Sequence, residues 1–118
     1  MTPAAAGAQI DLRKLDQMRE RLDLQLSDLA AIIGVDQSTL YRWRHGEATP
    51  RPLAWSRLAQ LDEMMQFFHR LFAGADRARE WLHTSTPEML GGQTPLAVMR
   101  AGRIDRVLTL LHFLARGA

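Results

Sequence analysis

The chain has 118 residues, enough for one domain or two very small ones, and 47% of them are hydrophobic, so a modest core can form. Its formal net charge of +2 gives no overall bias towards nucleic acid or an anionic surface. The absence of cysteine excludes disulfides and thiolate metal sites, and no apolar run approaches the ~20 residues that cross a bilayer. We therefore expect a cytoplasmic protein with no membrane segment.

The first predicted elements are a tail and a helix. Residues 1–8, within the segment MTPAAAGAQ, lack the basic start and apolar core of a secretory signal, and we expect a disordered tail. A first helix is predicted over about residues 10–22, because apolar residues recur there at helical spacing: Leu15, Met18 and Leu22.

Two short helices with clear end signals follow. One spans about residues 26–33 and ends at Gly34. The next begins after Asp36, a residue type favoured at the N-cap, and runs to about residue 45, where Gly46 supplies the position after the helix. No period-2 alternation is sustained, so the fold class is predicted to be all-α.

A long fourth helix is predicted after the segment EATPRP, with Pro52 in its first turn. An apolar stripe of about five turns runs along it, formed by Ala54, Leu58, Leu61, Met65, Phe68 and Phe72. A second stripe covers its distal half, formed by Met64, Phe67 and Leu71. A helix that is apolar on two sides must be covered on two sides, so we expect a spine that joins both halves of the chain and borders a second subunit.

The last part of the chain is predicted to contain several short helices separated by residues that start or stop a helix. A short helix over about residues 76–82 carries Trp81. In TPEMLGGQTPLAVMRAG, Thr94 is the expected N-cap of another short helix and Gly102 its stop. A terminal helix over about residues 103–115 aligns five apolar residues: Ile104, Val107, Leu108, Leu111 and Leu114.

The segment LSDLAAIIGVDQSTLYRWRHGEATP meets the physical requirements of a helix-turn-helix. Leu29, Ala30, Ile33 and Val35 form its apolar inner angle, and Gly34 takes the tight turn. Leu40 and Trp43 anchor the second helix from beneath. Six polar or aromatic residues are left facing outward or sideways: Gln37, Ser38, Thr39, Tyr41, Arg42 and Arg44. Such a set suits the major groove, where Gln pairs with adenine and Arg with guanine.

Over about residues 9–58 this pattern resembles the Cro/repressor-like helix-turn-helix of the Xre family. The resemblance implies double-stranded operator DNA as a partner. It implies Gln37, Ser38 and Arg42 as base readers, and it places Thr39, Tyr41 and Arg44 at the DNA backbone. Leu26 departs from the family pattern, because it stands where a phosphate-contacting Gln is usual and it cannot donate a hydrogen bond.

Residues 81–118 resemble the toxin-binding domain of MbcA/ParS/Xre antitoxins. The matching landmarks are W-L-x-T, a Pro and a Leu before Gly-Gly, x-T-P-L, a short helix ending in Gly, and R-V-x-x-L-L. The resemblance implies the Xre-type antitoxin of a bacterial RES–Xre toxin–antitoxin pair, acting as a homodimer. In that family the partner toxin degrades NAD⁺, and the C-terminal region of the antitoxin covers the toxin's active-site entrance.

Together these patterns predict an N-terminal helix-turn-helix bundle over residues 9–58, a long connecting helix, and a small helical toxin-binding and dimerisation domain over residues 59–118. Most apolar residues of the C-terminal part are expected in its core. The candidates for toxin contact are Phe113 and Arg116. No cofactor, metal site or catalytic set is predicted, since the histidines have no partner at metal-ligand spacing and the chain is small for an enzyme.

Two other functions remain open at this point. The chain could be a stand-alone Xre-family transcriptional regulator whose C-terminal domain only dimerises. It could also be an interaction scaffold whose helix-turn-helix no longer binds DNA, a reading that Leu26 and the nearly neutral charge support. In either case the third helix would still fold as part of a small helical core.

Overall fold

In the computed structural model, which describes residues 12–117, the chain is all-helical, as predicted, and the described residues contain no strand. In chain order the elements are α2 (Leu12–Arg21), α3 (Leu26–Ile33), α4 (Gln37–Arg44), α5 (Pro52–Leu71), α6 (Ala75–Thr84), the 3-10 turn η1 (Glu88–Leu90), α7 (Pro95–Arg100) and α8 (Ile104–Ala115). The predicted tail over residues 1–8 and the predicted helix start at residues 10 and 11 lie outside the described residues. Within residues 12–117 no helix is both long and apolar enough to cross a bilayer.

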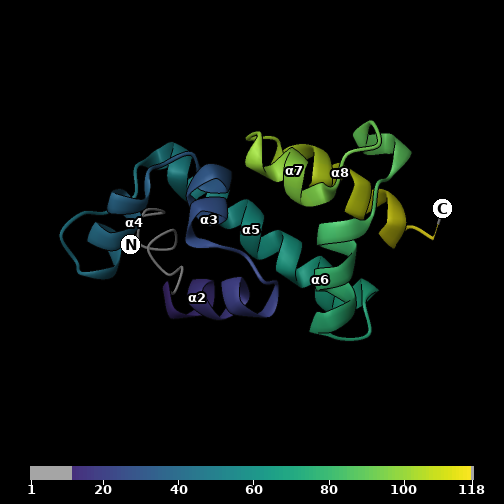
Figure 1. Cartoon of the computed structure of the whole chain (residues 1–118), viewed down its shortest axis with the longest axis horizontal. Helices are drawn as coiled ribbons and strands as arrows, with labels where there is room; N and C mark the ends of the chain where they lie inside the picture. Colours follow the sequence, from purple (N-terminus) through teal and green to yellow (C-terminus); the bar gives the residue numbers. More distant parts are fainter. Residues whose placement is uncertain (1–11, 118) are drawn as a thin grey trace, which may run out of the picture.

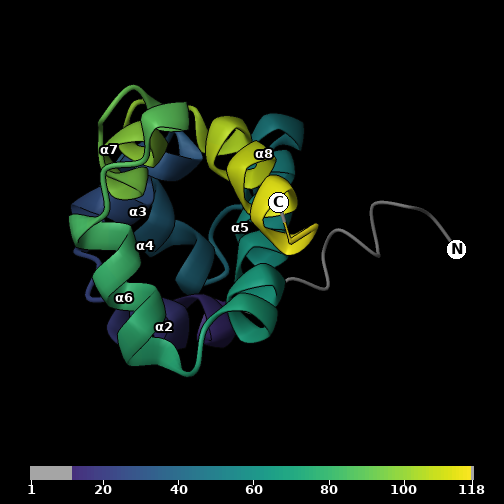
Figure 2. The ribbon, with the colours of Figure 1, turned by 90° about the vertical axis from the view of Figure 1, so that its right-hand side faces the viewer.

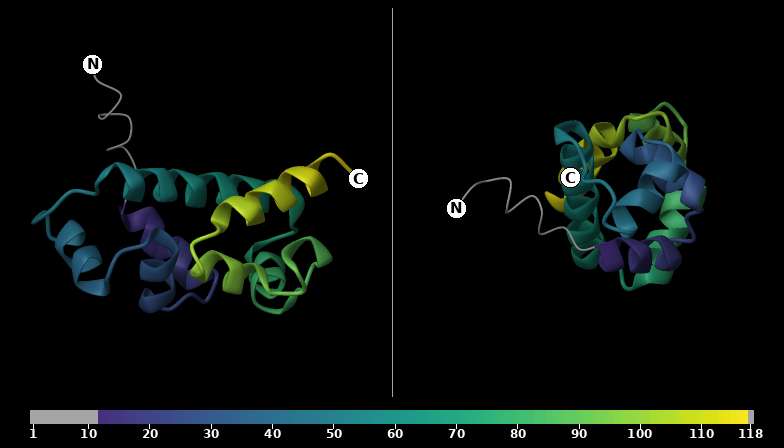
Figure 3. Two further views of the ribbon diagram at one scale, coloured as in Figure 1. Left: turned by 90° about the horizontal axis from the view of Figure 1, so that it is seen from above. Right: turned by 90° about the vertical axis from the view of Figure 1, so that its left-hand side faces the viewer.

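Helix α5 is the axis of the molecule, which measures 42 × 31 × 24 Å. It runs along the long dimension, with α4 near one end and α6 and the C-terminus towards the other (Figure 1). Viewed from that second end, α5 and α8 lie on one side, α3, α6 and α7 on the other, and α2 beneath them (Figure 2). Viewed from above, α8 lies beside α5 (Figure 3).

One continuous hydrophobic core joins the two halves of the chain. Helix α5 contributes six buried side chains to it: Ala54, Leu58, Leu61, Met64, Phe67 and Phe68. The first predicted stripe is therefore only partly right, because Met65 and Phe72 are half-buried. The second stripe is covered as predicted, with Met64 and Phe67 buried, since α8 lies against that side and its His112 ring contacts Phe67 at 4.6 Å between centroids.

The terminal helix differs from its predicted stripe at its last turn. Ile104, Val107, Leu108 and Leu111 are buried as expected, but Leu114 is 37% exposed and Leu110 is buried in its place. The reason is tertiary, because the last turn of α8 projects beyond the helices that cover the rest of it (Figure 3). An apolar residue at helical spacing is buried only where a neighbouring element reaches it.

The segment between η1 and α7 folds as its sequence predicts. Gly91 and Gly92 have φ angles of 67° and 76°, in the left-handed region that glycine tolerates without a Cβ clash. They reverse the chain after η1. Thr94 then caps α7 by accepting a hydrogen bond from the Ala97 amide at 3.1 Å, and Pro95 occupies the first turn. These signals fix the direction of α7 before α8 begins.

Because the core is continuous, we expect the described halves to unfold together. Leu111 is fully buried in α8, and Leu111→Ala should lower the free energy of unfolding by about 2–5 kcal/mol. Urea titrations followed by tryptophan fluorescence and by far-ultraviolet circular dichroism should give one coincident transition. The control, Leu114→Ala at the exposed last turn, should cost much less. Two separated transitions would show that the halves fold independently.

Candidate functional site

Helices α3 and α4 form the helix-turn-helix that the sequence predicts. Gly34 ends α3 with a φ of 87°, and the amides of Gly34 and Val35 both donate to the Ala30 carbonyl, at 2.8 and 3.0 Å. The predicted inner-angle residues Leu29, Ala30 and Ile33 are buried, Val35 is half-buried, and the predicted anchors Leu40 and Trp43 are buried beneath α4. The turn and the two anchors set the angle between α3 and α4.

Asp36 caps α4 and accepts hydrogen bonds from the hydroxyls of Ser38 and Thr39. Its Oδ1 accepts hydrogen bonds from the Thr39 hydroxyl at 2.7 Å, the Ser38 hydroxyl at 2.9 Å and the Thr39 amide at 3.0 Å. The hydrogen bonds from Thr39 and then Ser38 lower the pKa of the Asp36 carboxyl below its usual value. Arg42 also donates to the Thr39 hydroxyl oxygen, at 3.3 Å. Both hydroxyls are therefore held at the start of α4 in the free chain.

The outward face of α4 carries most of the residues predicted to meet DNA. Gln37, Ser38, Tyr41 and Arg42 are exposed, whereas Thr39 is half-buried. The Tyr41 ring is 57% exposed and stacks on His45, with centroids 4.0 Å apart. His45 was not among the residues predicted to meet DNA, although its i,i+4 spacing from Tyr41 was a usable signal.

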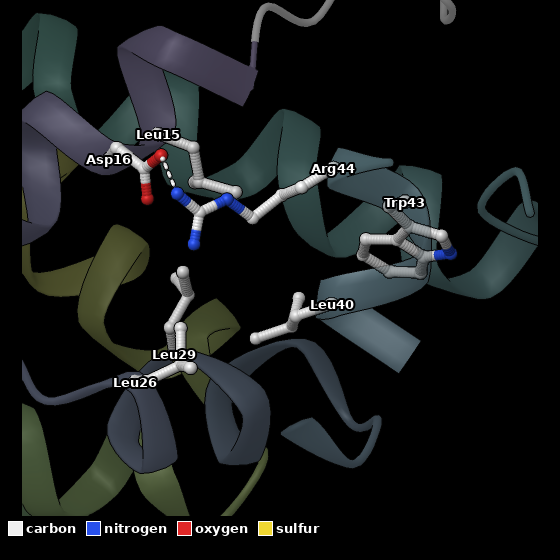
Figure 4. Close-up of a pocket in the computed structure, with 7 residues that line it drawn as sticks. All are labelled: Leu15, Asp16, Leu26, Leu29, Leu40, Trp43 and Arg44. Carbon is white, nitrogen blue, oxygen red and sulfur yellow. Dashed lines mark ion pairs between the residues drawn. The ribbon is translucent and has the colours of Figure 1, made fainter. Parts of the chain in front are cut away.

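Arg44 lies on a different side of α4 from the groove-facing set. Its guanidinium forms an ion pair with Asp16 of α2 at 3.0 Å, above a small hollow between α2, α3 and α4 (Figure 4). Leu26 and Leu29 line the same hollow (Figure 4). The Arg44 side chain is still 47% exposed, so it retains donors that face solvent. Leu26 packs against the core instead of standing free at the start of α3.

At the opposite end of the molecule, the last turns of α8 expose apolar and basic side chains. Phe113 is 43% exposed and Arg116 is exposed beside it. The preceding turn is attached to α5, because His112 lies 2.9 Å from a Glu63 carboxylate oxygen. Figure 1 places this end of α8 far from α4. The predicted DNA residues and the predicted toxin residues therefore occupy two separate ends.

Three polar contacts tie the C-terminal elements to the first helices. His83 of α6 contacts the Leu22 carbonyl at 2.7 Å, and Arg57 of α5 donates to the Gly102 carbonyl at 2.6 Å. Arg100 of α7 donates to the Asp28 carboxylate of α3 at 2.6 Å. Arg100 is half exposed to solvent, yet its guanidinium reaches the buried Asp28 because α7 packs against α3. Within residues 12–117 no group of three His, Asp or Glu side chains could hold a metal ion.

Comparison with known proteins assigns both ends to families. Residues 15–62 match the helix-turn-helix family, and residues 69–117 match the antitoxin Xre/MbcA/ParS C-terminal toxin-binding domain. The C-terminal part of the chain therefore matches the toxin-binding domain of Xre/MbcA/ParS antitoxins, and this domain follows a helix-turn-helix. The chain is thus an antitoxin of a toxin–antitoxin system that carries a helix-turn-helix, and both matched families are regulatory rather than enzymatic.

The antitoxin also shares its fold with a solved structure. A chain in the crystal structure of the M. tuberculosis MbcT–MbcA toxin–antitoxin complex superposes with a TM-score of 0.62 at 24% sequence identity. The match covers 100% of this chain and 98% of that chain, so the arrangement of the helices is shared from end to end. No curated protein matches the antitoxin in sequence.

The cap of α4 gives a prediction about pH. Because the pKa of Asp36 is lowered in the folded chain, its carboxylate stabilises the fold above the ordinary value of 3.8, and this contribution is lost as pH falls through the lower folded-state value. Asp36→Ala should therefore lower the melting temperature at pH 7, and the difference from the unchanged chain should shrink towards pH 3. Asp36→Asn, which keeps a capping oxygen, should be milder than Asp36→Ala. An Asp36→Ala difference that is equal at both pH values would contradict the cap's role.

Proposed function

We propose that this antitoxin binds and neutralises a RES-domain toxin that degrades NAD⁺, and represses its own operon by binding operator DNA. The observation that carries the proposal is the separation of two exposed faces on one rigid core. The outward face of α4 lies at one end, and the Phe113–Arg116 end of α8 lies at the other (Figure 1). One chain can hold DNA and a toxin without either blocking the other.

The DNA-reading role falls to residues 9–58. Gln37, Ser38 and Arg42 read base edges, since amide, hydroxyl and guanidinium groups match the donors and acceptors of the major groove. Thr39, Tyr41 and Arg44 contact the DNA backbone from the flanks of α4. Arg44 does so while sharing its charge with Asp16, which weakens but does not remove its attraction to phosphate.

The toxin-binding role falls to residues 59–118. Phe113 supplies an apolar anchor and Arg116 a cation next to it, the residue types that most often carry binding energy at protein interfaces. The core residues of α8 hold this end in a fixed direction before binding, so little ordering cost arises on association. The partner surface is the active-site entrance of the toxin. We assign no catalytic residue, cofactor or metal to the antitoxin itself.

The antitoxin acts as a homodimer on a two-fold operator. A dimer of this motif places its recognition helices in successive major grooves, with half-sites about one DNA turn, roughly 34–36 Å, apart. Sedimentation velocity at micromolar concentration measures this state directly.

Arg42→Ala tests the DNA face. It should weaken binding to the region upstream of the coding sequence by about 1–3 kcal/mol, with relaxed specificity at one base position. Fluorescence anisotropy with a labelled duplex, repeated at rising salt, gives the affinity and its salt slope. Arg77→Ala removes the same charge from exposed α6 and should change the affinity little. Equal effects of the two substitutions would remove Arg42 from the DNA interface.

The toxin face needs point substitutions rather than a truncation. Removing α8 would also remove five buried core side chains, and loss of function would then say nothing about contact. Phe113→Asp combined with Arg116→Glu should reduce toxin affinity by at least about 2 kcal/mol, roughly thirtyfold, while DNA binding persists.

Co-expression with the neighbouring gene product provides the measurement, with cell growth and cellular NAD⁺ as readouts. The double variant should fail to rescue growth, whereas the matched charge reversal Arg77→Glu should rescue it. Full rescue by the double variant would remove Phe113 and Arg116 from the toxin interface. A toxin that stops growth with NAD⁺ unchanged would contradict the RES assignment and leave the antitoxin assignment standing.

A further inference from the structure

Asp28 is the one buried charged side chain in the described part of the chain, with 5% of its surface exposed. It lies in the first turn of α3, and its Oδ2 accepts a hydrogen bond from the Gln25 amide at 2.8 Å, which closes the start of that helix. A buried carboxylate without a cation would be strongly destabilising. Its cation comes from a residue 72 positions away in the chain.

That cation is Arg100, in the last turn of α7. Its Nε donates to Asp28 Oδ1 at 2.6 Å, and its Nη2 contacts the same oxygen. The contact joins the C-terminal end of α7 to the N-terminal end of α3, and the two helices lie side by side (Figures 1 and 2). The arginine complements the negative end of α7 and the aspartate the positive end of α3, so both charges favour this end-to-end arrangement.

The start of α3 is the part of a helix-turn-helix that faces the DNA backbone, while α4 enters the groove. Here Leu26 is half-buried against the core, and Gln25 and Ser27 are exposed at the same end. The position of α3 therefore also decides how α4 is aimed. Apart from the buried side chains of α3, its start is held by Arg100, a residue outside the helix-turn-helix match, which ends at residue 62.

We propose that Arg100 is a positioning residue for DNA reading: through Asp28 it holds the start of α3, so the antitoxin domain sets the DNA affinity of the helix-turn-helix even with no toxin present. The proposal rests on the proposed DNA-binding function and adds a residue that does not itself touch DNA. Any movement of α7 on toxin binding then reaches the helix-turn-helix through this contact, beside the shared core and the Arg57–Gly102 contact.

The experiment compares Arg100→Gln with Arg103→Gln in the full-length chain. Among residues 12–117, Arg103 forms its ion pair with Asp105, two residues on, and both side chains are exposed, so its loss removes the same charge without touching α3. Anisotropy with the upstream duplex and with a scrambled duplex separates specific from non-specific affinity. Arg100→Gln should lose about tenfold in specific affinity relative to Arg103→Gln, a usual size for coupling between sites.

Further variants separate positioning from its alternatives. Asp28→Asn should lose a similar amount of specific DNA affinity. The double variant Asp28→Asn/Arg100→Gln should lose no more affinity than the weaker-binding single variant, because both substitutions break the same contact. If Arg100 instead contacted a DNA phosphate directly, Arg100→Gln would weaken binding to both duplexes and lower the salt slope of binding by about one. Where Arg100→Gln fails to fold, Arg100→Lys keeps the charge but replaces the planar two-nitrogen fork with a single ammonium nitrogen, and it should lose several-fold in specific affinity.

Hydrogen exchange of the α3 and α4 amides gives a readout that does not depend on DNA. Exchange should rise in both helices in Arg100→Gln but not in Arg103→Gln. If the unchanged chain binds no specific DNA, the DNA arm of the proposed function fails, and the exchange data still decide whether Arg100 holds α3. Specific affinity or α3 exchange in Arg100→Gln equal to that of Arg103→Gln would overturn the proposal.

Discussion

The structure depends on one constraint: α5 is apolar on two sides and both must be covered. Helix α3 packs against it from the DNA-reading half, and α8 packs against it from the antitoxin half. Because α5 contributes side chains to the core of both halves, neither half can bury its apolar residues without the other. A chain of this size gains a core large enough to be stable by sharing it rather than by building two small ones.

Polar contacts then fix the register of the parts that α5 brings together. Apolar packing is non-directional, so it sets which elements touch more strongly than how they are aligned. The contacts of Arg57 with the Gly102 carbonyl, His83 with the Leu22 carbonyl and Arg100 with Asp28 supply direction. None of the three contacts involves the exposed face of α4 or the last turn of α8, so both remain exposed to solvent.

Local signals in the sequence predicted the helices well. Asp36, Thr94, Pro52 and the glycines mark helix ends through contacts made within a few residues, and the structure places helix ends at each of them. Such signals do not depend on the rest of the fold. The exposed fraction of Leu114 and the burial of Leu110 could not be predicted in this way, since helical spacing identifies an apolar side but not where the covering helix stops.

The sequence by itself determined the all-helical fold and the helix-turn-helix with its outward-facing Gln37 and Arg42, because these depend on spacing along the chain. It also carried the resemblance of the C-terminal part to an antitoxin toxin-binding domain, which the family comparison matches. The tertiary structure decided which charges are engaged. Arg44 meets Asp16 and Arg100 meets Asp28 only because α2 and α7 are folded against α4 and α3. An arginine on an isolated helix looks the same whether it faces water, DNA or a buried carboxylate, and only the packing of distant elements distinguishes them.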